Sequence, residues 1–155
     1  MNVLIVDDEE EIREILTFTL ETEISADFIY AESGQEAIKK ISEIDNLDLI
    51  ICDYNMPNGN GETVYKYLLD NNITLPYVLC SSSKKEEFDV FNDEGPFLFE
   101  ITKPYVYEGV SEMLKKYEQF RKSENINKAP VSKNETGYST ISLELLQLFP
   151  QIPSD

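Results

Sequence analysis

Short apolar runs alternate with segments of helical periodicity along most of the chain. The runs predict five strands, at residues 3–6, 28–31, 49–52, 77–80 and 97–101. After each run, apolar side chains recur at intervals of three and four residues, which predicts helices at 9–22, 34–44, 61–71, 84–93 and 106–122. Strands that alternate with helices form parallel sheets with helices on both faces, so the pattern predicts an α/β fold.

The first and fourth of these helices differ in the strength of their pattern. In the first, Ile12, Ile15, Leu16, Thr19 and Leu20 define the face expected to be buried, and the glutamates and the single arginine lie on the other face. The fourth has a weaker stripe, formed by two phenylalanines.

The pattern also divides the chain into three parts. Residues 1–121 are long enough for one domain with its own core. Residues 122–138 have few apolar side chains and many linker-type residues, which indicates a flexible connector. Residues 139–155 form a short apolar segment that is interrupted by prolines and cannot make a core alone. We expect this segment to dock on the first domain, to pair with a second copy, or to begin a truncated output module.

Composition narrows the classes of function. Thirty acidic and thirteen basic residues give a net charge of −17, which argues against direct binding to nucleic acid or to anionic membranes. The chain has no histidine, which excludes Ser-His-Asp and Cys-His catalysis and a phosphohistidine within it. The first apolar run is too short for a signal peptide or a membrane span, so we expect a cytoplasmic protein.

The two cysteines, Cys52 and Cys80, each end an apolar run. This position is typical of reduced core residues in a cytosolic protein rather than of a disulfide framework. Because they precede the ends of adjacent strands, we expect both to lie on the same face of the sheet, near each other.

Polar side chains follow the predicted strands where each strand ends. Asp7 and Asp8 follow the first strand, Asp53 ends the third, Ser81 ends the fourth, and Lys103 follows the fifth. In the order 2-1-3-4-5 of a doubly wound, flavodoxin-like sheet, the first and third strands flank the point where ligands bind. Three carboxylates at that point need a compensating cation, and Mg²⁺ suits oxygen ligands. Without Asp53 and Lys103, the pair Asp7 and Asp8 would be interpreted as the solvated start of a helix.

A lysine beside a predicted Mg²⁺ site suggests that a strongly anionic group, such as phosphate, binds there. An aspartate can attack phosphorus and form an acyl phosphate, and Mg²⁺ would withdraw charge from the phosphoryl oxygens. Ser81 and Lys103 can each hold a phosphoryl oxygen.

Four motifs occur in a fixed order along the chain. They are VLIVDDEEEIREIL, LIICDYNMPNGNG, LPYVLCSSS and ITKPY, spread over residues 1–121. As a set, they resemble the receiver domain of two-component response regulators.

The resemblance implies a role for each site residue. Asp53 would be the phospho-acceptor, Asp8 would bind Mg²⁺ directly, Asp7 would act on Mg²⁺ mainly through water, and Asn55 would offer its backbone carbonyl. Ser81 and Lys103 would hold the phosphoryl group, and the Lys103-Pro104 bond would be cis, as is common in the family.

The resemblance also implies partners. The phosphoryl donor would be a sensor histidine kinase or a histidine phosphotransfer protein, and the phosphorylated state would be relayed to an output module or effector protein. A homodimer through the fourth predicted helix, the fifth strand and the fifth helix is compatible with it. The chain would catalyse only its own phosphorylation and dephosphorylation, so it would be a signalling domain rather than a conventional enzyme.

One position departs from the family pattern. A switch aromatic is expected three residues before the lysine, where this chain has Glu100, with Phe99 beside it. Either a one-residue shift brings Phe99 to the switch position or the aromatic is absent, which leaves a phosphorylation-independent interaction module as an alternative. A Mg²⁺-dependent aspartate phosphatase is a poorer match, because its motif has a second aspartate where this chain has Asn55. A flavodoxin-type flavin binder does not fit three carboxylates in the pocket.

Overall fold

The computed structural model of the chain describes residues 1–83, 87–88, 90–91, 95–105 and 107–128. The chain divides into two units, Met1–Phe120 and Arg121–Asp155. The first unit contains all of the sheet. None of the described helices is long and apolar enough to cross a membrane.

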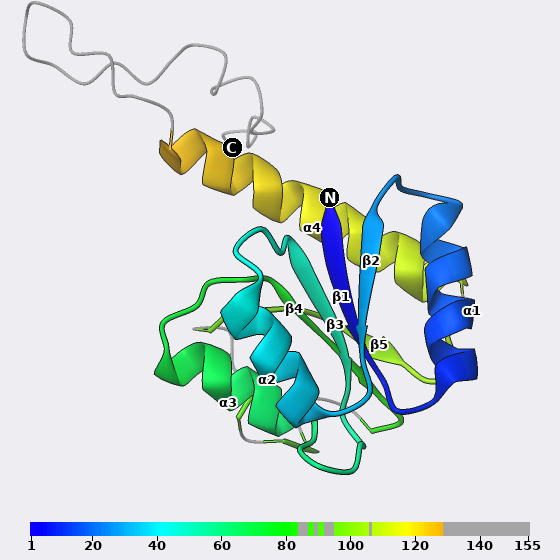
Figure 1. Cartoon of the computed structure of the whole chain (residues 1–155). Helices are drawn as coiled ribbons and strands as arrows, with labels where there is room; N and C mark the ends of the chain where they lie inside the picture. The colour runs from blue at the N-terminus through cyan, green and yellow to red at the C-terminus, as the bar shows by residue number, and fades with distance from the viewer. Residues whose placement is uncertain (84–86, 89, 92–94, 106, 129–155) are drawn as a thin grey trace, which may run out of the picture. The chain divides into compact units, whose positions relative to one another are not determined.

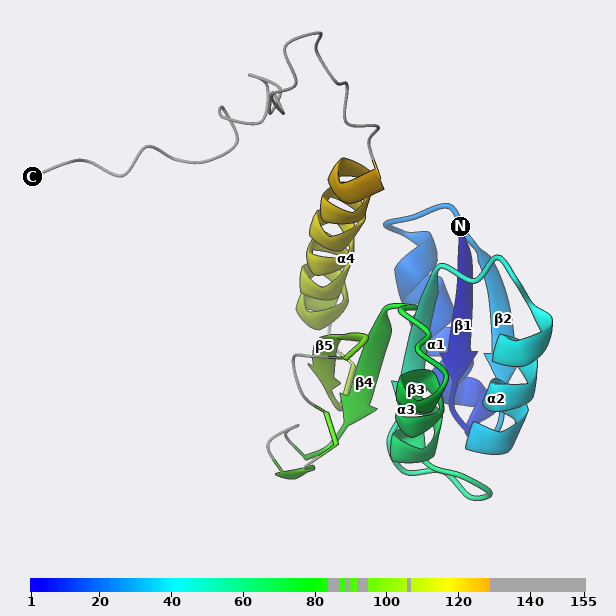
Figure 2. The same ribbon diagram turned by 90° about the vertical axis from the view of Figure 1, so that its left-hand side faces the viewer.

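Five parallel strands form one sheet in the order β2-β1-β3-β4-β5, as predicted (Figure 2). The strands are β1 (Asn2–Val6), β2 (Asp27–Ala31), β3 (Leu49–Asp53), β4 (Tyr77–Ser81) and β5 (Phe97–Thr102). The helices are α1 (Glu10–Glu21), α2 (Gly34–Glu43), α3 (Gly61–Asp70) and α4 (Tyr107–Lys128). Each predicted strand is therefore found within one or two residues of its expected place.

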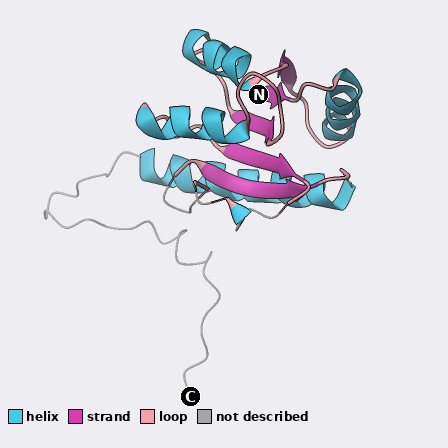
Figure 3. Ribbon diagram, turned by 90° about the horizontal axis from the view of Figure 1, so that it is seen from below, coloured by secondary structure: helices cyan, strands magenta, loops and turns pink. Residues whose placement is uncertain are grey.

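Helices pack on both faces of the sheet (Figures 1 and 3). One core lies between the sheet and α2 and α3. This α2–α3 cluster comprises Leu4, Val6, Ala31, Ala37, Ile41, Ile50, Cys52, Met56, Val64, Tyr65, Leu68, Tyr77, Leu79 and Phe91. The other core lies between the sheet and α1 and α4. This α1–α4 cluster comprises Val3, Ile5, Leu16, Leu20, Leu49, Ile51, Val78, Cys80, Ile101, Val110, Met113, Leu114 and Tyr117. The strands alternate between the two, as a period of two requires.

The buried face of α1 differs from its predicted face. Leu16 and Leu20 are buried as expected, but Ile15 is 52% exposed, and the prediction for that residue was wrong. Arg13, expected on the polar face, is buried instead. A long side chain with a polar head can lie on a buried face if its head finds a hydrogen-bond partner, and periodicity alone does not show that partner.

The fourth predicted helix, at 84–93, falls largely on residues outside the described part of the chain. Its described residues form no α-helix, and the structure shows none between β4 and β5 among the residues it describes. Phe88 and Phe91 contact the core individually. Phe88 stacks on Tyr54, with ring centroids 4.0 Å apart, and Phe91 packs 4.9 Å from Tyr65. Aromatic burial therefore accounts for both phenylalanines without a helical face.

The fifth predicted helix is longer than expected. We expected it to end at residue 122, whereas α4 continues to Lys128. No proline or glycine occurs between residue 122 and Pro130, so nothing in that stretch interrupts helical hydrogen bonding. The rest of the expected connector and the apolar segment 139–155 lie outside the described residues.

Candidate functional site

Three carboxylates meet at the carboxyl edge of the sheet, the lower edge in Figure 1. Asp7 directly follows β1, and Asp53 is the last residue of β3, which pairs with β1 through Val6 and Cys52. Asp7, Asp8 and Asp53 each place a carboxylate oxygen within 4.8 Å of the others. Asp7 and Asp53 are buried, whereas Asp8 is exposed.

Lys103 reaches into this group from the end of β5. Its Nζ lies 2.9 Å from Asp53 Oδ1 and 3.3 Å from Asp7 Oδ2. Its backbone N–H donates to the carbonyl of Ser81 at 2.9 Å, which ties the lysine to the end of β4. The Lys103-Pro104 peptide bond is cis, which confirms that expectation.

Burial and charge contact act in opposite directions on the pKa values of Asp53 and Lys103. Burial raises the pKa of Asp53 above its usual value, and the hydrogen bond from Lys103 opposes this effect. Burial also disfavours the charged form of Lys103, but contact with Asp53 and Asp7 outweighs it, so the lysine pKa lies above its usual value. Among the residues that the structure describes, one ammonium faces three carboxylates, which leaves an excess of negative charge in this part of the site.

The excess of negative charge and the carboxylate oxygens of this site suit Mg²⁺. The ligands on offer are carboxylate oxygens, which hard divalent cations prefer, and the exposed Asp8 leaves part of the cluster open to solvent. Asp7 is held in place, because its Oδ1 accepts a hydrogen bond from the backbone N–H of Glu9 at 3.0 Å. The residues present therefore suit a metal that retains several water ligands.

Ser81 occupies the predicted place at the end of β4 and is buried. Its Oγ accepts a hydrogen bond from the backbone N–H of Ser83 at 3.0 Å. Since a hydroxyl also carries one hydrogen, Ser81 retains a donor for an oxygen ligand.

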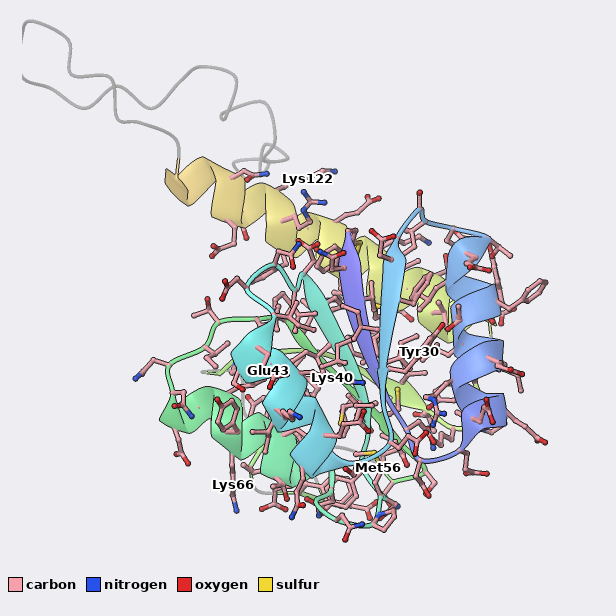
Figure 4. The ribbon with its side chains drawn as sticks, viewed as in Figure 1. Tyr30, Lys40, Glu43, Met56, Lys66 and Lys122 are labelled. Carbon is pink, nitrogen blue, oxygen red and sulfur yellow. The ribbon has the colours of Figure 1, made fainter. Side chains whose placement is uncertain are left out.

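The loop after β3 is held by hydrogen bonds to the start of α2. The backbone N–H groups of Gly34 and Gln35, at the start of α2, donate to the carbonyls of Gly59 and Asn58. Asn58 and Gly59 both have positive φ angles, which these residue types tolerate. The same loop carries Asn55, whose backbone N–H interacts with Asp53, and the buried Met56, labelled in Figure 4.

The cysteines lie on opposite faces of the sheet, so the prediction of a shared face was wrong. Cys52 belongs to the α2–α3 cluster and Cys80 to the α1–α4 cluster. The register explains this result, because β4 places Cys80 beside Asp53, and Cys52 therefore pairs with Leu79. Both thiols are reduced and buried, and burial raises the pKa of Cys80 to about 12. Neither is a reactive thiolate at neutral pH.

The position three residues before the lysine belongs to Glu100. The register between β4 and β5 shifts between Tyr77 and Val78, so that Leu98 is the extra residue on β5. From Phe99 onward the pairing is continuous, and both Phe99 and Ile101 pack with the α1–α4 cluster. Alternation along the strand therefore places Glu100 on the opposite face, and Phe99 does not replace it.

Sequence reasoning missed two residues that support the site. Tyr105 was given no role in the site, but its hydroxyl lies 3.5 Å from Asp7 Oδ2. Arg13 was assigned to a polar face, but its guanidinium donates to the backbone carbonyl of Asp7 at 2.7 Å. Its other terminal nitrogen is 3.4 Å from Glu32. In the sequence, the contact between Arg13 and Asp7 is indicated only by the presence of an arginine six residues after the aspartate.

Arg13→Met should destabilise the fold by about 1–3 kcal/mol, because the buried carbonyl of Asp7 would lose its donor. Urea unfolding followed by circular dichroism measures this change. Glu32→Gln is the matched control: it affects only the weaker contact with an exposed partner, and we expect it to change stability by less than about 0.5 kcal/mol. Equal losses in the two variants would contradict the role given to the Asp7 carbonyl.

Known proteins are similar to a large part of this chain. The family model of the response regulator receiver domain matches residues 3–119. The alkaline phosphatase synthesis transcriptional regulatory protein PhoP of Bacillus subtilis is 40% identical over 87 residues, which cover 56% of this chain and 35% of PhoP. The chain thus spans about a third of the length of this curated relative.

Solved structures agree. The receiver domain of Francisella response regulator 1452 has a TM-score of 0.65 and 26% identity, over 77% of this chain and 98% of that one. The response regulator protein TrrA of Thermotoga maritima, solved in complex with Mg²⁺ and BeF, has a TM-score of 0.64 and 28% identity, over 75% and 97% of the two chains.

Proposed function

The chain belongs to the response regulator receiver domain family, and on this basis we propose that it is a signalling switch phosphorylated on Asp53. The observation that supports this most strongly is the convergence of Asp7, Asp8 and Asp53 with Lys103 at one edge of the sheet. The donor would be a sensor histidine kinase or a histidine phosphotransfer protein, because the chain has no histidine of its own.

In the proposed reaction, a carboxylate oxygen of Asp53 forms a bond to phosphorus while the phosphorus–nitrogen bond of the donor phosphohistidine breaks. The donor imidazole leaves, and the product is an acyl phosphate. Lys103, already 2.9 Å from Asp53, would pair with one phosphoryl oxygen, and Ser81 would donate its hydroxyl hydrogen to another. Later attack by water at phosphorus would release inorganic phosphate and return Asp53 to the carboxylate.

We assign the Mg²⁺ site of this switch to four residues. Asp8 and Asp53 would bind the ion directly, Asn55 would do so through its backbone carbonyl, and Asp7 would act through water. When bound, Mg²⁺ would offset the charge of the carboxylates and withdraw charge from the phosphoryl oxygens. The excess negative charge of the cluster and its oxygen donors support this assignment.

The proposed output is a change at the surface formed around β5 and α4, passed to an output module or effector protein. Phosphorylation would shift an existing equilibrium between two conformations of that surface. We place residues 1–121 in the receiver domain, 122–138 in a connector whose first residues continue α4 to Lys128, and 139–155 in a short apolar segment. A homodimer through the β4–β5 segment, β5 and α4 fits this scheme, as does a cytoplasmic location. The charge of −17 opposes direct DNA binding by these residues.

Glu100 favours a second candidate, a phosphorylation-independent interaction module. Its carboxylate stands where an aromatic switch would be expected, and its Oε1 is buried without a hydrogen-bond partner among the described residues. In this alternative the fold is retained for binding, and the state of Asp53 has no influence on the output.

Incubation with acetyl phosphate separates the two candidates. The full chain should gain one phosphoryl group by intact mass when Mg²⁺ is present, and should gain none when a chelator is added. Hydroxylamine should remove the group, because it cleaves acyl phosphates but not phosphate esters of serine. Absence of a Mg²⁺-dependent, hydroxylamine-sensitive adduct would refute the proposed switch and favour the binding module.

A further inference from the structure

Tyr105 lies beside the site but was not assigned as the phospho-acceptor, as a Mg²⁺ ligand or as a residue that holds the phosphoryl group. It follows Lys103 by two residues, is half-buried, and packs against the α1–α4 cluster. Its hydroxyl is 3.5 Å from Asp7 Oδ2 and also interacts with the Cys80 thiol. The Nζ of Lys103 lies 5.6 Å from the centroid of its ring. The charged cluster consists of Asp7, Asp8, Asp53 and Lys103. The hydroxyl of Tyr105 therefore contacts one member, Asp7, and its ring contacts another, Lys103.

The hydroxyl is one of three donors that the described residues provide to the Asp7 carboxylate. Oδ1 accepts from the backbone N–H of Glu9, and Oδ2 faces both the ammonium of Lys103 at 3.3 Å and the hydroxyl of Tyr105. A hydroxyl is an uncharged donor, so it can restrain the carboxylate without cancelling the charge that attracts a cation. Partners of this kind usually determine how a metal-binding carboxylate is oriented.

The ring restricts the lysine. The ammonium of a lysine sits on a flexible four-carbon side chain, so it can take several positions. In Lys103, two carboxylates compete for it. An aromatic face within about 6 Å attracts an ammonium and keeps it near that position. At 5.6 Å, the ring of Tyr105 forms one wall of the space in which the ammonium can move.

We propose that Tyr105 is a positioning residue of the phosphorylation site: its hydroxyl orients Asp7 for Mg²⁺, and its ring confines the ammonium of Lys103. This inference rests on the proposed function for its consequences in phosphorylation. Its first part concerns Mg²⁺ binding alone and can be tested without a phosphoryl donor.

The test compares two variants of Tyr105 with one control, all in the full chain. Tyr105→Phe removes only the hydroxyl, and Tyr105→Leu removes the ring as well. Tyr107→Phe is the control, because its hydroxyl also contacts a carboxylate, that of Glu23, but neither of these residues belongs to the charged cluster. Calorimetric titration with Mg²⁺ measures affinity, and phosphoryl gain from acetyl phosphate at saturating Mg²⁺ measures rate.

We expect Tyr105→Phe to weaken Mg²⁺ binding about tenfold and to leave the saturated rate unchanged. Tyr105→Leu should weaken Mg²⁺ binding similarly. It should also lower the rate of phosphoryl gain at saturating Mg²⁺ about tenfold or more, because the ring no longer restricts the position of the Lys103 ammonium. Tyr107→Phe should change neither quantity. If Tyr105 served only to pack the core, the Phe variant would not change Mg²⁺ affinity alone while the Leu variant changed both affinity and rate.

The outcomes separate this inference from the proposed function. If Tyr105→Phe binds Mg²⁺ like the wild type and melts at the same temperature, the role of the hydroxyl is refuted while the switch stands. If the wild type gains no phosphoryl group but its Mg²⁺ affinity depends on the Tyr105 hydroxyl, the switch is refuted and the orientation of Asp7 stands. If the Leu variant does not fold, the Phe variant alone decides the first part, and equal affinities in wild type and Phe variant overturn it.

Discussion

Asp53→Asn is expected to abolish phosphoryl gain from acetyl phosphate. The substitution preserves the shape of the side chain and an oxygen that can accept from Lys103, but a neutral amide is a far weaker nucleophile than a carboxylate. Intact mass after incubation with Mg²⁺ should show only the unmodified chain. No other change in the cluster should have so complete an effect, because Asp8, Asp7 and Lys103 would assist the reaction without forming the new bond.

The stability of this variant distinguishes lost chemistry from lost folding. Asp53 is 5% exposed and shares its pocket with Asp7, so the neutral amide removes a buried charge and one repulsion, at the cost of the ion pair with Lys103. We therefore expect a melting temperature close to that of the wild type. Asp27→Asn, at the exposed start of β2, is the matched control and should gain phosphate normally. Phosphoryl gain in the Asp53 variant would place the acceptor elsewhere.

Gly61→Ala is expected to destabilise the fold and to slow phosphorylation together. A Cβ at this position would lie 2.8 Å from the carbonyl oxygen of Asp53 and 3.0 Å from both the Cα of Tyr54 and the hydroxyl oxygen of Tyr77. Gly61 cannot move away easily, because its N–H donates to the Tyr54 carbonyl and its own carbonyl accepts from the Tyr77 hydroxyl at 2.8 Å. The backbone of the acceptor itself would have to shift.

Overpacking of this kind typically costs about 1–3 kcal/mol, which urea unfolding would measure. Glu62→Ala is the neighbouring control, since it removes a partly exposed ion pair with Lys66 and should cost less than about 1 kcal/mol. Because the displaced atoms belong to Asp53 and Tyr54, phosphoryl gain should fall even under conditions where the variant is fully folded. A fully active Gly61 variant with wild-type stability would contradict the crowding around the acceptor.

Much of the fold could be predicted because its pattern is local. The strands were predictable from short apolar runs, and α2 and α3 from residues spaced three and four apart. Once the strands were known to be parallel, Asp7, Asp53 and Lys103 had to lie at the same edge of the sheet, and the structure places them within contact distance. Residues at the ends of regular elements are therefore predictable from sequence, because the topology of the sheet alone brings them together.

The remaining features depended on relations between distant segments. Arg13 is buried because its guanidinium donates a hydrogen bond to the backbone carbonyl of Asp7, and the period of α1 does not show this contact. A single extra residue at Leu98 determined the face on which Phe99 lies, and the pairing of Asp53 with Cys80 separated the two cysteines.

Local patterns in the chain were enough to predict the order of the strands, the sheet edge that carries the carboxylates and the candidate acceptor, Asp53. The strand registers, the donors around Asp7 and the place of Tyr105 between two charged groups became known from the three-dimensional structure. The physical reason is that periodicity reports which side of an element is buried. Register and hydrogen-bond partners depend instead on how separate elements fit against one another, and a shift of one residue reverses the face of a side chain.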